Sequence, residues 1–182
     1  MRIIAGKYRG RVWHPPKGLP VRPTTDRTKE SLFNILNNWY DWEGLRVLEL
    51  FAGTGNISLE FWSRGVAEVI SVDQHHRCVK AIETVRKDFG ISGGKVIRMD
   101  AAAYVRQYQG EAFDIVFMDP PYAMPRQREL VMNILAGPLL HEKSTLIVEH
   151  ASQIKLDDLP GFDQQKTYGS SRISFVDKPP TS

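Results

Sequence analysis

The chain has 182 residues, of which 42% are hydrophobic and 25% are charged, and its formal net charge is +3. This size and composition fit one globular domain with a full core and a short extension. No apolar stretch approaches the ~18 residues of a membrane span, so we expect no association with a membrane. Residues 1–6 contain no long apolar run, and Cys78 is the single cysteine, so we expect neither a secretory signal nor an internal disulfide. These features predict a cytoplasmic protein.

Positive charge is concentrated at the start of the chain. Residues 1–30 hold eight lysines and arginines and two acids, which gives +6, so the remaining residues sum to −3. A basic segment on a slightly acidic body favours a polyanionic partner. The alternative is a solvated basic face that binds nothing.

The first elements are short. The stretch R-I-I-A-G-K-Y-R-G-R-V-W, residues 2–13, predicts two short strands around a turn that contains glycine. A helix follows, and one of the residues 24–26 is expected to cap it. Its apolar face has the spacing i, i+3, i+4, i+7 and consists of Leu32, Ile35, Leu36 and Trp39.

Strands and helices then alternate along the chain. Apolar runs predict strands at residues 46–51, 68–73, 95–100, 114–119 and 144–150, and helical patterns lie between them at 56–64, 75–89, 101–108 and about 125–136. Strands joined by helices form parallel sheets that are covered on both faces. The runs F-D-Q-Q-K-T-Y and S-R-I-S-F-V-D flank Gly169-Ser170 and predict a closing antiparallel hairpin. The predicted fold class is therefore α/β, with an open doubly wound sheet whose ligands bind at the carboxyl ends of strands.

Three strand ends carry residues that suit a nucleoside. The first strand runs into L-E-L-F-A-G-T-G-N, where Gly53 and Gly55 allow a tight turn, although Ser58 replaces the third glycine of G-x-G-x-x-G. The second ends at Asp73, where an acid binds ribose hydroxyls, and the third at Asp100, where a carboxylate suits an adenine amino group. A plain strand-to-helix turn and two helix caps are the alternatives. The three features in order on successive strands predict a cofactor that contains a nucleoside.

The fourth strand ends in D-P-P-Y, residues Asp119, Pro120, Pro121 and Tyr122. Proline has no N–H to donate and a fixed φ, so the ladder stops there and the chain direction is rigid. We hypothesise that the Asp119 carboxylate and the Pro120 carbonyl accept the two hydrogens of an aromatic amine and so aim its nitrogen lone pair. Tyr122 offers a face on which a base stacks. The alternative is an edge turn with a buried aromatic ring.

These residues resemble the amino-methylating branch of the class I S-adenosylmethionine-dependent methyltransferases, with L-E-L-F-A-G-T-G as the first motif and D-P-P-Y as the fourth. Together with R-I-I-A-G-K-Y-R-G-R and R-P-T-T-D-R-T-K-E-S-L-F-N, they resemble the bacterial 16S ribosomal RNA guanine-N2 methyltransferases (the RsmD family) over essentially the whole chain. The resemblance implies a Rossmann-like sheet of seven strands, mostly parallel with a C-terminal antiparallel hairpin, at residues 24–182. It also implies a small N-terminal β-hairpin extension for RNA at residues 1–23.

The resemblance further implies the ligands and their residues. The cofactor would be S-adenosylmethionine, with S-adenosylhomocysteine as product, at Glu49, Phe51, Ala52, Gly53, Thr54, Gly55, Asp73, Gln74, Asp100 and Ala101. Asp119, Pro120, Pro121 and Tyr122 would hold the guanine amine. The partner would be 16S rRNA or an assembly intermediate of the small ribosomal subunit, contacted by Lys7, Arg9, Arg11, Arg22 and Arg27. We expect a monomer that uses no metal, because the sulfonium methyl is already activated.

Other functions share parts of this pattern. An adenine-N6 DNA methyltransferase would use the same D-P-P-Y chemistry, but the chain leaves little room for a target-recognition domain. A glutamine-N5 protein methyltransferase fits the basic segment and Asp119 less well. An NAD-dependent dehydrogenase, or a binding module with an inactive cofactor site, explains the glycine turn but not D-P-P-Y. The histidines are scattered and have no H-E-x-x-H partner, which agrees with the expectation of no metal site.

Overall fold

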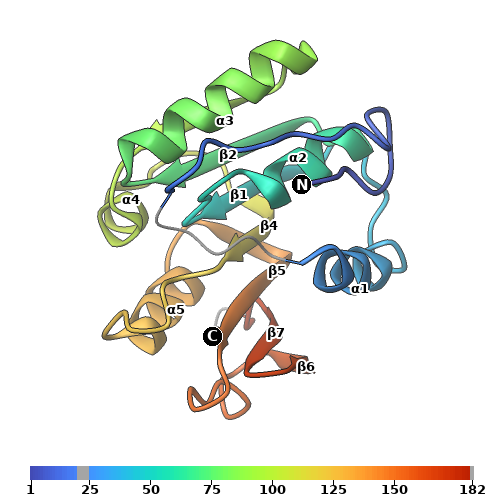
Figure 1. The fold of residues 1–182 in the computed structure, drawn as a ribbon. Helices are drawn as coiled ribbons and strands as arrows, with labels where there is room; N and C mark the ends of the chain where they lie inside the picture. Colours follow the sequence, from blue (N-terminus) through green and yellow to red (C-terminus); the bar gives the residue numbers. More distant parts are fainter. Residues whose placement is uncertain (20–24, 181–182) are drawn as a thin grey trace.

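A computed structural model describes residues 1–19 and 25–180 of the chain. The elements in this part are α1 (Asp26–Leu36), β1 (Arg46–Leu50), α2 (Asn56–Arg64), β2 (Glu68–Asp73), α3 (His76–Phe89), β3 (Gly94–Arg98), α4 (Ala101–Gln107), β4 (Phe113–Met118), α5 (Gln127–Ala136), β5 (Leu140–Ala151), β6 (Phe162–Tyr168) and β7 (Ser171–Asp177) (Figure 1). No helix within the described residues has the length and apolar character needed to cross a membrane.

The strands form one seven-stranded sheet in the order β3-β2-β1-β4-β5-β7-β6. β1 is parallel to both β2 and β4, and β3 and β5 extend the parallel part on either side. β7 runs antiparallel between β5 and β6. The direction of strand succession therefore reverses between β1 and β4, and the predicted doubly wound sheet with a closing antiparallel hairpin is confirmed.

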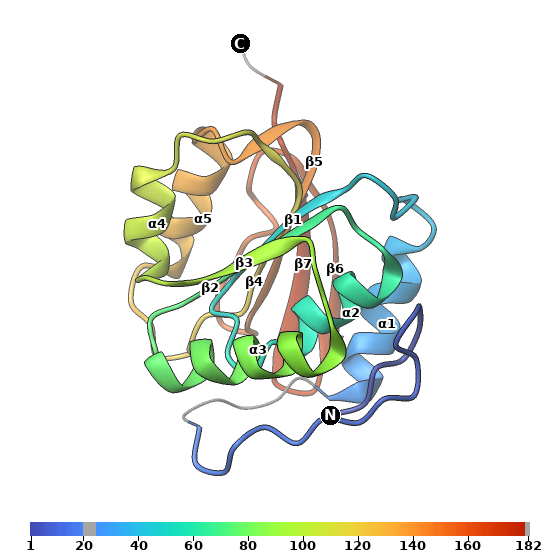
Figure 2. The ribbon, with the colours of Figure 1, turned by 90° about the horizontal axis from the view of Figure 1, so that it is seen from above.

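Each face of the sheet carries its own hydrophobic core. α1, α2 and α3 cover one face, and α4 and α5 cover the other (Figure 2). Alternate residues of a strand supply the two cores, as the pleat requires: Val47 of β1 belongs to the first and Leu48 to the second. The central strands are buried on both sides, which explains why their sequences read as continuous apolar runs.

Residues 1–13 lie against α2 and add Ile3 and Tyr8 to the first core. The predicted N-terminal hairpin is present but short, since its only ladder pairing in the described residues is the isolated bridge between Arg2 and Val12. The backbone comes very close to α2 at Gly6, where φ is +80° and an added Cβ would lie 1.8 Å from the Ser63 carbonyl oxygen. Tertiary contacts with α2 therefore replace strand pairing in this segment.

Several boundaries differ from the predicted ones. Thr25 caps α1, accepting a hydrogen bond from the Thr28 N–H at 3.2 Å, as expected for one of the candidates. The helix ends at Leu36, however, so Trp39 lies beyond it, 40% exposed, with its ring edge-on to Phe175. β5 begins earlier than residue 144, and β3 ends at Arg98 rather than at residue 100.

Candidate functional site at the carboxyl edge of the sheet

The ends of β2, β1 and β4 meet at one edge of the sheet. Leu50, the last residue of β1, pairs with Val72 on one side and with Met118 on the other. Asp73, the loop that follows Leu50, and Asp119 therefore lie side by side at the point where strand succession reverses. In sheets of this kind the reversal opens a crevice that binds ligands.

Hydrogen bonds close the loop that follows β1 onto β2. The Ala52 N–H donates to the Val72 carbonyl at 3.0 Å, and the Gly53 N–H donates to Asp73 Oδ2 at 2.8 Å. The Gly55 N–H donates back to the Ala52 carbonyl at 2.7 Å. Phe51 starts the turn with φ +60°, a value that few residues other than glycine adopt. We call residues 51–55 the glycine loop.

Gly55 is required by both conformation and space. Its φ is +75°, and an added Cβ would lie 2.8 Å from Ile82 Cγ1 of α3. It is also the N-cap of α2 and contributes no side chain to the cap. The glycine loop therefore keeps α2 and α3 close behind it only because this position has no side chain.

Asp73 holds the glycine loop in place. Its carboxylate is 9% exposed, with Oδ2 accepting from Gly53 and Oδ1 accepting from the His75 N–H at 2.7 Å. A carboxylate oxygen has two lone pairs, so each oxygen retains capacity for a hydroxyl donor. The predicted ribose contact is thus compatible with the observed structural role, and it stays a prediction.

Glu49 lies behind the glycine loop and is 3% exposed. Its Oε2 accepts from the Ser58 N–H at 2.9 Å and from the Ser58 hydroxyl, which in turn lies 2.6 Å from the hydroxyl of Ser71. Burial raises the pKa of the Glu49 carboxyl to about 8, and the hydrogen bonds from Ser58 oppose that rise only in part. Ser58 occupies the place of the missing third glycine, and its hydroxyl satisfies this buried acid.

The outer part of the predicted cofactor site is less enclosed. Because β3 ends early, Asp100 is not the end of the third strand, and it caps α4 by accepting from the Ala103 N–H at 2.9 Å. Ala101 beside it is buried, whereas Gln74, after β2, is exposed. The cap that was the alternative for Asp100 is therefore present, and contact of these three residues with a cofactor stays a prediction.

The D-P-P-Y segment leaves β4 as a braced turn. The Pro121 carbonyl accepts from the Met124 N–H and from Gln127 Nε2, both at 2.8 Å, and Gln127 Nε2 also lies 3.3 Å from the Tyr122 carbonyl. The Tyr122 side chain is exposed, at 43%, so the alternative of a buried aromatic ring is wrong. Sequence reasoning missed Gln127, which is 3% exposed at the start of α5, because a lone glutamine carries no sequence signal.

The basic residues predicted to bind RNA come from two elements of the described chain, the N-terminal segment and α1. Lys7, Arg9 and Arg11 are exposed on the N-terminal segment, and the Arg11 guanidinium lies over the ring of Phe89 at 4.9 Å from its centroid. Arg27 is on α1, where it lines a surface cavity of about 410 Å³ shared with Lys166 of β6. Arg22 lies outside the described residues. Within the described part of the chain, no three His, Cys, Asp or Glu side chains form a group that could hold a metal ion.

Comparison with known proteins places the chain in a family. The family model described as Conserved hypothetical protein 95 matches residues 1–177. The YlbH protein of Bacillus subtilis is 31% identical over 184 residues, covering 98% of this chain and 99% of the relative. Ribosomal RNA small subunit methyltransferase D of Escherichia coli K12 is 30% identical over 164 residues, covering 88% and 79%.

A solved structure extends the comparison to the fold. Magnesium protoporphyrin IX methyltransferase from Synechocystis, solved with bound S-adenosylmethionine, superimposes with a TM-score of 0.67 at 18% identity, covering 84% of this chain and 78% of that one. At that identity the likeness concerns the fold alone. The family match and the E. coli relative confirm the resemblance that the sequence motifs carried, and the chain belongs to the family described as Conserved hypothetical protein 95.

Proposed function

We propose that this protein transfers a methyl group from S-adenosylmethionine to the exocyclic N2 of a guanine in small-subunit ribosomal RNA. The observation that carries the proposal is the placement of D-P-P-Y beside the glycine loop, across the β1–β4 reversal. In this placement the residues proposed to hold the amine would lie next to those proposed to hold the cofactor. The 30% identity to the E. coli small-subunit rRNA methyltransferase supports methyl transfer to that RNA.

The glycine loop and its neighbours would bind the cofactor. Backbone groups of residues 51–55 would approach the methionine part, Asp73 would accept from the ribose hydroxyls, and Asp100 with Ala101 would border the adenine. When bound, S-adenosylmethionine supplies a methyl carbon made electrophilic by the sulfonium. The hydrogen bonds that fix the Gly53 N–H and the Asp73 carboxylate keep this side of the site rigid before any ligand arrives.

D-P-P-Y would bind and orient the amine. The guanine amine is planar and weakly nucleophilic, because its lone pair is delocalised into the ring. The Asp119 carboxylate and the Pro120 carbonyl would accept its two hydrogens, which favours a pyramidal nitrogen directed at the methyl carbon. The nitrogen would form its bond to the methyl carbon as the bond from that carbon to sulfur breaks, and one N–H proton would pass to water. Tyr122, which is exposed, would stack on the guanine once it has left its RNA stack.

The basic N-terminal extension, residues 1–23, would contact the phosphates of 16S rRNA or of an assembly intermediate of the small subunit. Lys7, Arg9 and Arg11 are exposed, which such contacts require. We expect the protein to act as a monomer in the cytoplasm, without a metal. In an Arg9→Ala, Arg11→Ala double variant, each lost phosphate contact should lower the slope of log K against log salt by about 0.7 on single-stranded RNA. Cofactor affinity should be unchanged, and an unaltered RNA slope would exclude the extension from binding.

The reaction itself is tested by incubating the protein with methyl-labelled S-adenosylmethionine and small-subunit rRNA. The RNA is then digested to nucleosides and the label is located by mass spectrometry. We expect N2-methylguanosine at a single position. Label in N6-methyladenosine would overturn the choice of amine, and label in added protein but not in RNA would favour a protein amide as substrate.

A further inference from the structure

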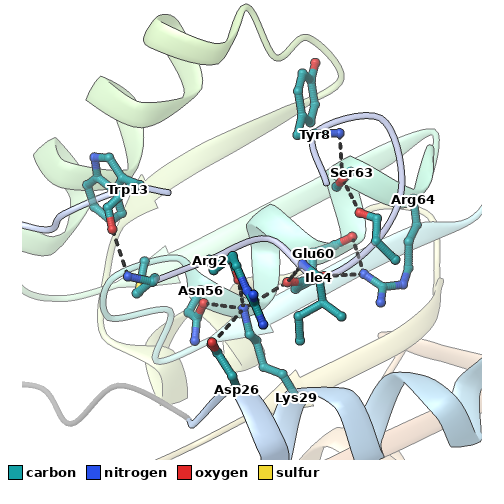
Figure 3. Close-up of polar contacts among 12 residues, drawn as sticks. Arg2, Ile4, Tyr8, Trp13, Asp26, Lys29, Asn56, Glu60, Ser63 and Arg64 are labelled. Atoms are coloured by element: carbon teal, nitrogen blue, oxygen red, sulfur yellow. Dashed lines mark hydrogen bonds and ion pairs between the residues drawn. The ribbon is translucent and has the colours of Figure 1, made fainter. Parts of the chain in front are cut away.

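A buried lysine connects three parts of the molecule next to the glycine loop. Lys29 lies on α1 and is 0% exposed. Its ammonium donates to the Arg2 carbonyl at 2.7 Å, to Asn56 Oδ1 at 2.9 Å and to Glu60 Oε1 at 2.8 Å (Figure 3). An ammonium has three hydrogens, so every one has an acceptor. Lys29 is one of the eight lysines and arginines in residues 1–30, but because it is buried it does not add to the basic surface of the N-terminal segment.

The acceptors on α2 link this lysine to the glycine loop. Asn56 is the first residue of α2 and follows Gly55 directly. Glu60 is also 0% exposed, and besides Lys29 it accepts from the Ile4 N–H at 2.9 Å and forms an ion pair with Arg64. A buried charge of this kind is tolerated only while its partners remain, so the position of Lys29 and the start of α2 are fixed together.

The N-terminal segment follows α2 from its first turn to its last (Figure 3). At the glycine loop the Thr54 hydroxyl donates to Met1 Sδ at 3.0 Å. At the other end the Tyr8 N–H donates to the Ser63 hydroxyl at 3.0 Å, and the Lys7 N–H donates to the Ser63 carbonyl at 2.6 Å. The segment that carries the exposed basic residues is thus docked on the helix that begins at the glycine loop.

We propose that Lys29 is a positioning residue that joins the docked N-terminal segment to the glycine loop and so sets the affinity of that loop for the cofactor. The proposal rests on the proposed function, because it takes S-adenosylmethionine as the ligand of the loop. Lys29 is buried and presents no surface to a ligand. It acts through the first turn of α2, and loss of its ammonium removes the bonds to Asn56 and to the Arg2 carbonyl.

The first test compares Lys29→Met with a matched control, Arg46→Met. Arg46 is a cation at the opposite end of β1 that pairs with Glu68 at 2.8 Å and donates to the Glu111 carbonyl at 2.7 Å. Both changes break an ion pair and a bond to a backbone carbonyl, but only Lys29 contacts the start of α2. Titration calorimetry with S-adenosylhomocysteine, well below both melting temperatures, should show roughly tenfold weaker binding for Lys29→Met and little change for Arg46→Met.

Steady-state kinetics separate positioning from a general loss of folded protein. In Lys29→Met the KM for S-adenosylmethionine should rise, while kcat at saturating cofactor stays near that of the wild type. Fewer folded molecules would instead lower kcat and leave KM unchanged. If Lys29→Met does not fold, Asn56→Ala removes the bond from Lys29 to the first turn of α2 and keeps the pair of Lys29 with Glu60. It should show the same rise in KM.

A double-mutant cycle tests the link to the N-terminal segment. Gly6→Ala should undock the segment, because the added Cβ meets the Ser63 carbonyl, and it changes no atom of Lys29 or of the glycine loop. If Lys29 carries the link, Gly6→Ala weakens cofactor binding in the wild-type background but adds little in Lys29→Met. Unchanged affinity in folded Lys29→Met, or fully additive effects, would overturn the proposal. A wild-type protein that does not bind S-adenosylhomocysteine would instead overturn the proposed function.

Discussion

The two loops that flank the strand reversal are made rigid in different ways. The glycine loop after β1 is held by tertiary contacts: its N–H groups bond to β2, and α3 packs directly behind Gly55. The D-P-P-Y segment after β4 is stiff because of its two prolines, and Gln127 of α5 donates a hydrogen bond to its Pro121 carbonyl. The conformation of the glycine loop therefore depends on contacts with the rest of the fold, whereas that of the D-P-P-Y segment is set largely by its own prolines.

This difference predicts how the two loops respond to substitution. Changes in the glycine loop or its supports should alter folding stability and cofactor affinity together. Changes at D-P-P-Y should alter methyl transfer while stability and cofactor affinity stay nearly constant. A methyl-transfer assay, a cofactor titration and an unfolding curve on the same set of variants would separate these classes.

The largest expected effect is that of Asp119→Ala. Removing one preorganised acceptor from the amine should lower methyl transfer by about 100- to 1,000-fold, taking oxyanion-hole donors as the nearest measured analogue. The affinity for S-adenosylhomocysteine should change little, because the proposed function assigns cofactor binding to the glycine loop and not to Asp119. Tyr122→Phe serves as the control and should keep most activity, since the proposed stacking needs only the face of the ring. Full activity in Asp119→Ala would refute the role given to D-P-P-Y.

Gly55→Ala should have the next largest effect, on stability. The methyl group would meet Ile82 and the residue would keep an unfavourable positive φ, so we expect a loss of about 1–3 kcal/mol from overpacking with a further loss from backbone strain. Gly44→Ala is the control, because Gly44 also has positive φ, +83°, but nothing lies within 4 Å of its added Cβ. Urea unfolding of both variants isolates the packing contribution. Equal losses would mean that only the backbone conformation matters.

Asp73→Asn should have a smaller effect, and it should lower both the cofactor affinity and the folding stability. An amide has one oxygen, so either the Gly53 N–H or the His75 N–H loses its acceptor. We expect about 1–3 kcal/mol less favourable binding of S-adenosylhomocysteine, with a parallel loss of stability. Asp100→Asn, at an exposed helix cap, should change both properties less. If stability fell but affinity did not, Asp73 would not be a ligand of the cofactor, and the expected coupling of stability and affinity in this loop would be wrong.

Glu49→Gln should change mainly the pH dependence of stability. The folded-state pKa is raised to about 8 from an ordinary value of 4.5, so the folded chain binds this proton more tightly than the unfolded chain does. Its stabilising contribution is complete below about pH 4.5 and is lost as the pH rises to about 8. Glutamine has no titrating proton, so the free energy of unfolding should fall less across this range. Denaturant unfolding at a series of pH values, with exposed Glu43→Gln as control, measures the difference.

The features predicted best from the sequence are those whose position follows from the order of the strands. Once D-P-P-Y and the glycine turn are assigned to the ends of parallel strands, their proximity follows, because such ends share one edge of the sheet. The missing third glycine looked like a weakness of the motif. The structure explains it, because the Ser58 hydroxyl bonds to Glu49 and Ser71, which come from neighbouring strands.

Residues whose role depends on distant partners could not be predicted. Lys29 follows a capped helix start and looks like a solvated lysine, but Glu60 and Asn56 of the next helix make it a buried one. Trp39 fits the helical spacing, but α1 ends at Leu36, and the ring of Trp39 packs edge-on against Phe175. In both cases a tertiary contact determines where the side chain lies, and the local sequence pattern contains no information about such a contact.

The position of β1 between β2 and β4 also sets an order in which the molecule can assemble. β2 is the next strand along the chain, whereas β4 is reached only after α3, β3 and α4. Closing the shorter loop costs less chain entropy, and synthesis from the N-terminus delivers β2 first. The glycine loop and Asp73 should therefore meet in a partly folded intermediate that D-P-P-Y has not yet joined. Pulse-labelled hydrogen exchange during refolding should show β1 and β2 amides protected before those of β4.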